Sequence, residues 1–190
     1  MPDLFDDEPR SKKHVAIAGN IGAGKTALTD VMGQYFNWKT IYEQVDENPY
    51  MTDFYNDMRR WSFNLQVFFL SRRFEQLQRI EENDESVVQD RSIYEDAQIF
   101  ARNLHEMGLM SARDYENYTQ LFSIMTSYLN PPSLLVYLRA SVPTLVNHIQ
   151  KRGREYESTI RIDYLERLQG HYEDWIGNYD RGPKLIIDID

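Results

Sequence analysis

The sequence predicts an α/β fold built on a five-stranded parallel sheet flanked by helices. Short apolar segments alternate with longer stretches of helical periodicity, the pattern of parallel strands joined by crossover helices. The first apolar segment runs directly into "GNIGAGKT", which fits G-x-x-x-x-G-K-[ST], the phosphate-cradling loop between a strand and a helix. The 190 residues suit one domain, with room for a small lid.

Five short apolar segments are expected to be the strands. They are residues 14–18, 39–43, 86–90, 133–138 and 184–189. In parallel sheets of this kind, ligands bind beyond the carboxyl ends of the strands. Polar side chains at those ends are therefore the first candidates for a functional site.

The stretches between the strands predict helices. In the longest, apolar residues recur at helical spacing. Ser111 with Asp114 three residues later is a capping-box pattern, and Pro143 stands in a first helical turn, where proline is tolerated. The predicted helices are 25–36, 61–81, 93–106, 112–129, 142–151 and 162–177.

The composition argues against several partners and sites. A formal net charge of −9 repels a phosphate backbone, so nucleic acid is not expected as a partner. The absence of cysteine removes disulfides, thiolate nucleophiles and cysteine zinc sites, and agrees with the cytoplasm. No apolar run approaches the roughly 20 residues of a membrane span, and no signal peptide is recognisable, so no membrane contact is expected.

The chain is expected to comprise a tail and a single domain. Residues 1–13 are polar and contain two prolines, which favours a flexible N-terminal tail, and residues 14–190 form the domain. The charged, glycine-broken stretch at about 151–161 predicts a lid.

The glycine-rich stretch predicts a nucleotide phosphate site. Its glycines let the backbone turn tightly and direct N–H groups at phosphate oxygens. Lys25 would reach the β- and γ-phosphates, and the Thr26 hydroxyl would bind Mg²⁺. The alternative is a glycine-rich turn without a ligand, which the flanking strand and helix make improbable. The predicted nucleotide-binding residues are Gly19, Asn20, Ile21, Gly22, Ala23, Gly24, Lys25 and Thr26.

Charged residues after two later elements extend this site. Asp90 ends an apolar strand and can hold Mg²⁺, while Arg91 can neutralise charge on a transferred group. The two could instead form a strand-end ion pair. Arg152 and Arg154 would clamp phosphates from the lid, although charge runs are usually solvated turns.

Two further residues predict an acceptor site. Glu43 ends the second strand, where a carboxylate suits a general base that takes a proton from an attacking hydroxyl, although it could be a surface acid. Gln66 interrupts the apolar run "LQVFFL", and a buried amide needs a hydrogen-bond partner. The edge of a nucleobase would provide one.

Five motifs in this order resemble those of the deoxyribonucleoside kinases. They are "GNIGAGKT", "YEQVDENPYM", "WSFNLQVFFLSRRF", "DRSIYEDAQIF" and "RGREYES", and the resemblance extends over about residues 14–188. Each motif after the first is weak alone, but the order is specific. The bacterial deoxyadenosine and deoxyguanosine kinases and animal deoxycytidine kinases are the most similar. The resemblance implies a P-loop kinase fold, a homodimer formed through helix packing, and phosphoryl transfer from ATP with Mg²⁺ to a deoxyribonucleoside in nucleotide salvage.

The resemblance also implies roles for individual residues. Glu43 would activate the 5′-hydroxyl, and Arg91 would approach both that hydroxyl and the phosphoryl group. The remaining assignments are Gln66 and Phe100 at the nucleobase, Tyr55 and Asp163 at the sugar 3′-hydroxyl, and Arg152 and Arg154 on the lid.

The sequence departs from the family pattern at three positions. Asp90 stands where animal members often have Glu, "EQV" replaces a common "EPV", and Asp163 replaces a longer Glu. The third departure shortens the reach to the 3′-hydroxyl.

Arg73 and Asp96 bear on the choice of base. In the family, a charged pair at these positions accompanies cytosine and purine substrates, so deoxyadenosine is expected first, then deoxyguanosine or deoxycytidine. A plain structural salt bridge between the two is the alternative.

Two other functions are less consistent with the sequence. A nucleoside monophosphate kinase, such as thymidylate kinase, needs arginines for the acceptor phosphate, but none occurs between Lys25 and Arg59. A non-catalytic P-loop nucleotide-binding module of the GTPase type needs an N-K-x-D segment, which is absent.

Overall fold

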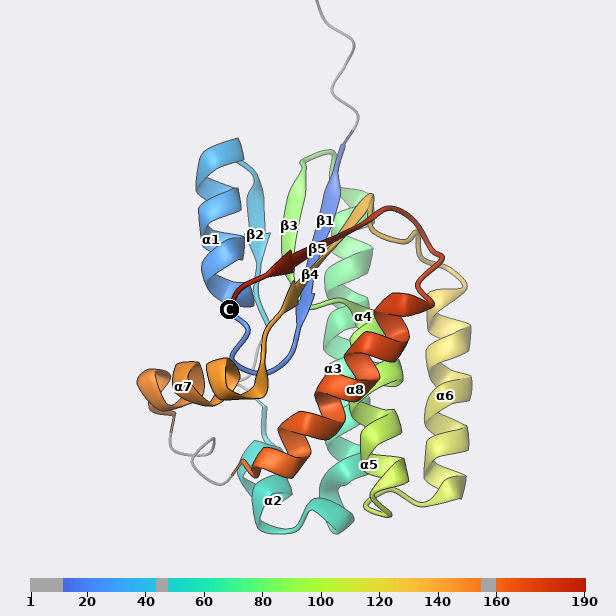
Figure 1. Ribbon diagram of the computed structural model, residues 1–190. Coiled ribbons are helices and arrows are strands. Elements are labelled where there is room, and N and C mark those ends of the chain that lie inside the picture. The colour runs from blue at the N-terminus through green and yellow to red at the C-terminus, as the bar shows by residue number, and fades with distance from the viewer. Residues whose placement is uncertain (1–11, 44–47, 155–159) are drawn as a thin grey trace, which may run out of the picture.

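The computed structural model describes residues 12–43, 48–154 and 160–190, and Figure 1 shows their arrangement. Five parallel strands form one sheet in the order β2-β3-β1-β4-β5. Their bounds are β1 His14–Gly19, β2 Lys39–Ile41, β3 Val87–Asp90, β4 Leu134–Arg139 and β5 Lys184–Asp188. The predicted fold class is therefore confirmed. The predicted tail at 1–13 lies almost wholly outside the described residues.

The central strands are apolar because both sheet faces are covered. All residues of β1 and β3 are buried, as expected for strands between two helical layers. Val15 and Ile17 pack with Leu28 of α1 and Leu145 of α7 on one face. Ala16 and Ala18 point to the other face, where they pack against α8 and the helical segment after β3. Alternate side chains of β1 thus pack into the two hydrophobic cores on opposite faces of the sheet.

The helices form the two outer layers. They are α1 Lys25–Phe36, α2 Met51–Asn56, α3 Met58–Glu82, α4 Ile93–Glu95, the π-helix η1 Asp96–Ala101, α5 Arg102–Glu106, α6 Ala112–Thr126, α7 Val142–Arg152 and α8 Ile162–Gly177. In Figure 1, α1 lies on one side of the sheet, whereas α3, α4, α5, α6 and α8 gather on the other. Half of the capping box predicted at Ser111 is confirmed, because its hydroxyl accepts a 3.1 Å hydrogen bond from the Asp114 amide, whereas the described chain shows no return bond from the Ser111 amide to Asp114.

Several predicted boundaries were wrong. Strand β2 ends at Ile41, so Glu43 lies two residues beyond it. Helix α3 begins at Met58 because Asp57 caps it, accepting a 3.0 Å hydrogen bond from the Arg60 amide, and the short α2 before it was not predicted. The predicted helix 93–106 contains the π-helical turn η1. In the described part of the chain, no helix is long and apolar enough to cross a membrane.

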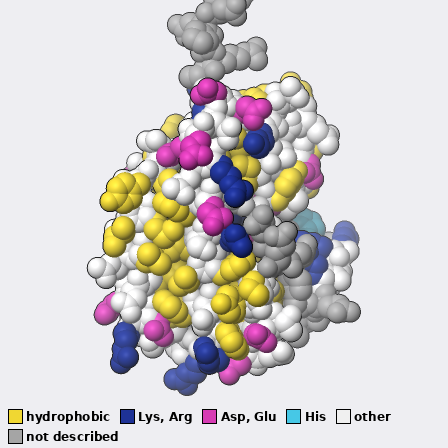
Figure 2. Space-filling model, turned by 180° about the vertical axis from the view of Figure 1, so that it is seen from behind, with side chains coloured by type: hydrophobic (Ala, Val, Ile, Leu, Met, Phe, Trp, Pro, Cys, Tyr) yellow, Lys and Arg dark blue, Asp and Glu magenta, His cyan; other side chains and the backbone are white. Residues whose placement is uncertain are grey.

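The surface of α6 is unusually apolar. Leu121, Ile124 and Tyr128 on and just after this helix are 39%, 53% and 76% exposed. Seen from behind in Figure 2, hydrophobic side chains gather on the face that α6 and α3 form. Exposed apolar patches of this kind mark interaction surfaces.

Candidate active site

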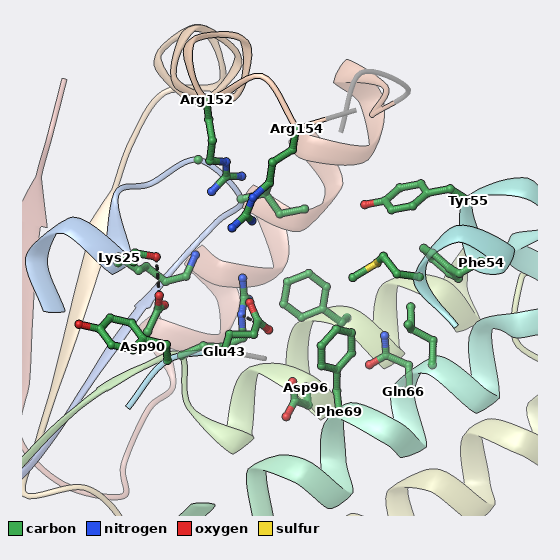
Figure 3. Close-up of a pocket in the computed structure, with 18 of the residues that line it drawn as sticks. Lys25, Glu43, Phe54, Tyr55, Gln66, Phe69, Asp90, Asp96, Arg152 and Arg154 are labelled. Atoms are coloured by element: carbon green, nitrogen blue, oxygen red, sulfur yellow. Dashed lines mark hydrogen bonds and ion pairs between the residues drawn. The ribbon is translucent and has the colours of Figure 1, made fainter. Parts of the chain in front are cut away.

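A cavity of ≈ 310 Å³ opens at the carboxyl ends of β1 and β3. This is the sheet edge at which parallel α/β proteins bind ligands, and the volume suits a small molecule. Figure 3 shows Lys25, Asp90 and Glu43 at one end, Gln66, Phe54 and Tyr55 at the other, and Arg152 and Arg154 above.

The loop after β1 is shaped by two glycines in the left-handed region. Gly22 has φ +85°, and a Cβ at this position would lie 2.8 Å from the carbonyl oxygen of Leu145, so a side chain would collide with α7. Gly24, at φ +81°, precedes α1 without a side-chain cap. The N–H groups of the first turn of α1 are therefore available to bind phosphate oxygens.

The side chain of Lys25 is held by a hydrogen bond to the backbone of its own loop. Its Nζ donates a 3.0 Å hydrogen bond to the carbonyl oxygen of Asn20. Burial, followed by the nearby charge of Arg91, lowers the pKa of Lys25 to about 8, although neighbouring carboxylates oppose this effect. The phosphates of a nucleotide would supply the negative charge that favours the ammonium form.

Asn20 anchors the loop instead of contacting the cavity. Its Nδ2 donates to the Leu165 carbonyl at 3.1 Å and to Gln169 Oε1 at 3.2 Å, both on α8. On the other side of the loop, His148 Nδ1 of α7 lies 2.8 Å from the Gly22 carbonyl oxygen. The phosphate loop is thus fixed between two helices.

Thr26 and Asp90 form a site suited to Mg²⁺. The Thr26 hydroxyl donates a 2.6 Å hydrogen bond to Asp90 Oδ2, and Oδ1 of Asp90 has no hydrogen-bond partner among the described residues. No group of three or more potential ligands from His, Cys, Asp and Glu exists in the described chain. A hydroxyl and one carboxylate are the protein's usual share when Mg²⁺ is also held by phosphates and water.

Glu43 is fixed by two guanidinium groups. Its Oε1 lies 2.9 Å from Arg73 Nη2 and 2.9 Å from Arg91 Nε. Burial alone would raise the pKa of Glu43, but the charges of Arg91, Arg73 and Lys25 lower it to about 2. The carboxylate is therefore ionised at neutral pH and can accept a hydrogen bond from a hydroxyl.

Arg91 is held in a strained conformation. Its φ is +73°, a value that non-glycine residues rarely adopt, and its amide donates a 2.9 Å hydrogen bond to the Ile17 carbonyl. The guanidinium lies 4.5 Å from the centroid of the Phe100 ring, and its Nη1 is 3.1 Å from the Tyr172 hydroxyl oxygen. The backbone turn thereby directs the cation back toward Glu43 and the phosphate loop.

The far end of the cavity combines an amide, an acid and an aromatic ring. Gln66 Oε1 is buried and has no hydrogen-bond partner within the described ranges. Asp96 and Phe100 come from η1, a helix type often found at functional sites. Burial raises the pKa of Asp96 to about 6 against the opposing charge of Arg73, so this carboxylate is mainly ionised at pH 7.

Comparison with known proteins places the chain in a family. Residues 15–190 match the family model for deoxynucleoside kinases. The chain belongs to the deoxynucleoside kinase family. It is 42% identical over 178 residues to the deoxyadenosine/deoxycytidine kinase of Bacillus subtilis, covering 93% of this chain and 82% of that one. It is 39% identical to the deoxyguanosine kinase of Lactobacillus acidophilus, covering 93% and 80%.

A solved structure agrees with this assignment. The deoxyadenosine kinase from M. mycoides with bound dATP superposes with a TM-score of 0.84 at 30% identity, over 94% of this chain and 92% of that one. The chain is thus a deoxynucleoside kinase by sequence and by fold.

The structure brings most of the predicted kinase residues into one cavity. Five other predicted residues do not line the cavity themselves. Gly19, Asn20, Ala23 and Gly24 belong to the phosphate loop, and Arg73 contacts the lining residues Glu43 and Asp96. The predicted residues in the lining are Ile21, Gly22, Lys25, Thr26, Glu43, Tyr55, Gln66, Asp90, Arg91, Asp96, Phe100, Arg152 and Arg154.

Two expectations about the lid region change. Lys151 and Arg152 form the last turn of α7, which Gly153 caps with φ +67°, so the first two residues of the expected lid are helical. Asp163 is not brought to the cavity. Arg161 binds both of its oxygens, at 2.9 and 3.1 Å, and the side chain is half exposed. Residues 155–159 of the expected lid and the "EQV" departure lie outside the described residues.

Six lining residues were not predicted from the sequence: Tyr42, Met51, Phe54, Leu65, Phe69 and Tyr164. Most are apolar or aromatic, and in the sequence they look like ordinary core positions. Tyr42, the neighbour of Glu43, could have been predicted from the sequence, because it follows the same strand end. Tyr164 could not have been predicted, because it reaches the cavity from α8, which is far away in the chain.

Proposed function

We propose that this kinase transfers the γ-phosphoryl group of ATP to the 5′-hydroxyl of a deoxyribonucleoside, with deoxyadenosine as its preferred substrate. One observation carries the proposal: a single cavity joins the phosphate loop, the ionised Glu43 and the amide oxygen of Gln66, which has no partner among the described residues. These are a donor site, a general base and a base-reading group. A relative that binds dATP supports a nucleotide donor.

Each charged residue has a role in the proposed transfer. Glu43 accepts the proton of the 5′-hydroxyl, while Arg91 and Lys25 stabilise charge on the transferred group. Thr26 and Asp90 hold Mg²⁺, which would neutralise charge on the β- and γ-phosphates. Arg152 and Arg154 approach the phosphates from the end of α7 and the residues after it. The sugar lies between these groups and Tyr55.

The preference for deoxyadenosine rests on the groups at the base end. Adenine and cytosine carry exocyclic amino groups that donate hydrogen bonds, whereas thymine has none. Gln66 Oε1 and the carboxylate of Asp96 are acceptors for such a donor. The names of the relatives, which cover deoxyadenosine, deoxycytidine and deoxyguanosine kinases, agree with an amino-bearing base.

A direct assay tests the proposed function. Transfer of radiolabelled phosphate from ATP with Mg²⁺ is measured to each of the four deoxyribonucleosides, to dTMP and without acceptor. The proposal expects the highest kcat/KM with deoxyadenosine. Transfer to another nucleoside would keep the reaction and overturn the base assignment. Transfer only to dTMP would indicate a monophosphate kinase, and hydrolysis without transfer a nucleotide-binding module.

Nucleotide binding is expected to weaken above pH 8. Phosphate favours the protonated form of Lys25, whose pKa is about 8 in the free protein, so binding at higher pH requires uptake of a proton. Affinity for ADP without metal should fall about tenfold between pH 7 and pH 9, measured by calorimetry. In Lys25→Arg the cation stays charged, and the affinity should be nearly constant over this range. An equal pH dependence in both proteins would contradict the assignment.

The metal assignment predicts a changed Mg²⁺ requirement in Asp90→Asn. The amide can still accept the Thr26 hydrogen bond, but it lacks the charge that attracts the cation. The Mg²⁺ concentration for half-maximal rate is expected to rise roughly tenfold. Asp188→Asn, at the end of β5 and outside the cavity, is the matched control. Unchanged Mg²⁺ dependence in Asp90→Asn would remove Asp90 from the metal site.

We also propose that the kinase is a homodimer whose two subunits contact each other through α6. Leu121, Ile124 and Tyr128 are spaced to present one exposed face, which a two-fold-related copy would bury. Light scattering should give a mass near two chains of 22.6 kDa. The variant Ile124→Lys should have the mass of one chain and should still fold, since this side chain is 53% exposed. A wild-type monomer would contradict the proposal.

We place this reaction in the cytoplasm and in a single domain formed by residues 14–190. The absence of cysteine agrees with a reducing compartment. The continuous sheet, whose strands come from both ends of the described chain, supports one domain.

A further inference from the structure

Arg73 contacts two carboxylates that have different tasks in the proposed reaction. Its Nε lies 2.7 Å from Asp96 Oδ2, and its Nη2 lies 3.2 Å from Asp96 Oδ1. The same Nη2 lies 2.9 Å from Glu43 Oε1. A guanidinium group is planar and rigid, so the positions of the two carboxylates are tied to each other.

Arg73 is not itself part of the cavity lining, whereas both of its partners are. Asp96 faces the cavity near Gln66, and Glu43 faces it near the phosphate loop, as Figure 3 shows. Arg73 is 3% exposed. A nucleoside in the cavity can therefore contact the two acids but not Arg73 itself.

Glu43 depends on its arginine contacts for its position. It lies two residues beyond the end of β2, so the sheet's hydrogen bonds do not fix it. Both guanidinium groups bind Oε1, Arg73 at 2.9 Å and Arg91 at 2.9 Å. An acceptor hydroxyl can therefore bind Oε2 without displacing either arginine. Small errors in the placement of such a group lower the rate strongly.

We propose that Arg73 is a positioning residue that couples recognition of the nucleobase at Asp96 to the placement of the general base Glu43. A base whose amino group donates to Asp96 fixes that carboxylate. Asp96 then fixes Arg73, and Arg73 fixes Glu43 in line with the 5′-hydroxyl. A base that leaves Asp96 without a donor binds but reacts slowly, because Glu43 is less well placed. This inference rests on the proposed function and adds to it that base selection acts on the chemical step.

Removing one amino group from the substrate tests this coupling without changing the protein. Purine 2′-deoxyriboside is deoxyadenosine without its 6-amino group. Single-turnover transfer rates at saturating nucleoside and apparent Kd values are measured for both compounds by rapid quench, with enzyme in excess. In the wild type, we expect the analogue to lower the transfer rate about tenfold. Its apparent Kd should change less than its rate.

Two variants decide whether this rate effect passes through Arg73 and Glu43. In Glu43→Gln and in Arg73→Lys, the ratio of the two transfer rates should fall from about ten to within about twofold of one, since energetic coupling disappears when either end of the connection is removed. Lysine keeps the charge of Arg73 but cannot hold both acids in one plane, so its effect reports on geometry. Arg72→Lys, the neighbouring and exposed arginine, should keep the wild-type ratio.

The results distinguish a failure of the coupling from a failure of the proposed function. If the ratio is the same in all four proteins, or if the analogue affects only Kd, the coupling through Arg73 is overturned while the kinase reaction stands. If the wild type transfers no phosphate to deoxyadenosine, the proposed substrate itself fails. Glu43→Gln carries the test even if Arg73→Lys folds poorly.

Discussion

Replacing Glu43 by glutamine is expected to lower kcat by roughly 10²–10⁴-fold, while ATP still binds. The amide has nearly the same shape but carries no charge, so it cannot take up the proton of the 5′-hydroxyl. The loss corresponds to about 3–5 kcal/mol of transition-state stabilisation. Steady-state rates with deoxyadenosine, together with calorimetric titration of ATP, measure the two parts of the prediction.

The same substitution changes the electrostatics around Arg73 and Arg91. Both guanidinium groups are buried and lose one of their carboxylate partners, so the variant should also unfold at a lower temperature. Thermal unfolding is therefore recorded beside the rates, and kcat is compared at a temperature where both proteins are folded. Glu43→Asp is the second variant, because it keeps the charge and withdraws the carboxylate by one methylene. A kcat for Glu43→Gln within threefold of the wild type would rule out Glu43 as the base.

The sequence was sufficient for the parts of the site that depend on local pattern. The phosphate loop has a fixed spacing of glycines, Lys25 and Thr26, and each residue type follows from the task of binding phosphate. Asp90 could be placed beside it because the carboxyl ends of parallel strands share one edge of a sheet. Gln66 was recognisable because an amide in an apolar run is unusual in itself.

Other parts of the site depend on contacts that no local pattern encodes. Arg73 and Asp96 were predicted as a pair, but the third member of the group, Glu43, is 30 residues away and joins them only in the folded chain. Asp163 has the residue type for a sugar contact, yet Arg161, two residues earlier, holds its carboxylate at the surface. The residue type alone does not indicate which of two possible partners is within reach.

Helix boundaries failed for a similar reason. The spacing of apolar residues over 93–106 fits a helix, and it does not distinguish an α-helix from one with a π-helical turn at Asp96–Ala101. Asp96 and Phe100 of this turn line the cavity. The turn packs against α3 and α8, which are distant in sequence.

Replacing Gln66 by leucine is expected to separate the function of this kinase from its stability. Leucine removes the hydrogen bonds that the amide would make with the nucleobase edge and leaves the base groups unpaired. We expect kcat/KM to fall roughly 10²–10³-fold for deoxyadenosine, while ATP affinity is unchanged. Steady-state assays with each deoxyribonucleoside, and the same assays on the exposed Gln78→Leu of α3 as the matched control, measure this effect.

The free protein should keep its stability in Gln66→Leu. Gln66 Oε1 is a buried acceptor without a partner in the described part of the chain, and such a group destabilises the folded state. Leucine has a similar size and would lie beside the apolar lining residues Leu65 and Phe69, so Tm should not fall. A fall in Tm together with the loss of activity would mean that Gln66 is a structural residue whose partner lies within the protein. Retained activity would mean that the nucleobase is read elsewhere. Reduced activity in a protein of unchanged stability is the result expected of a ligand-binding role, because the amide then serves the substrate and not the fold.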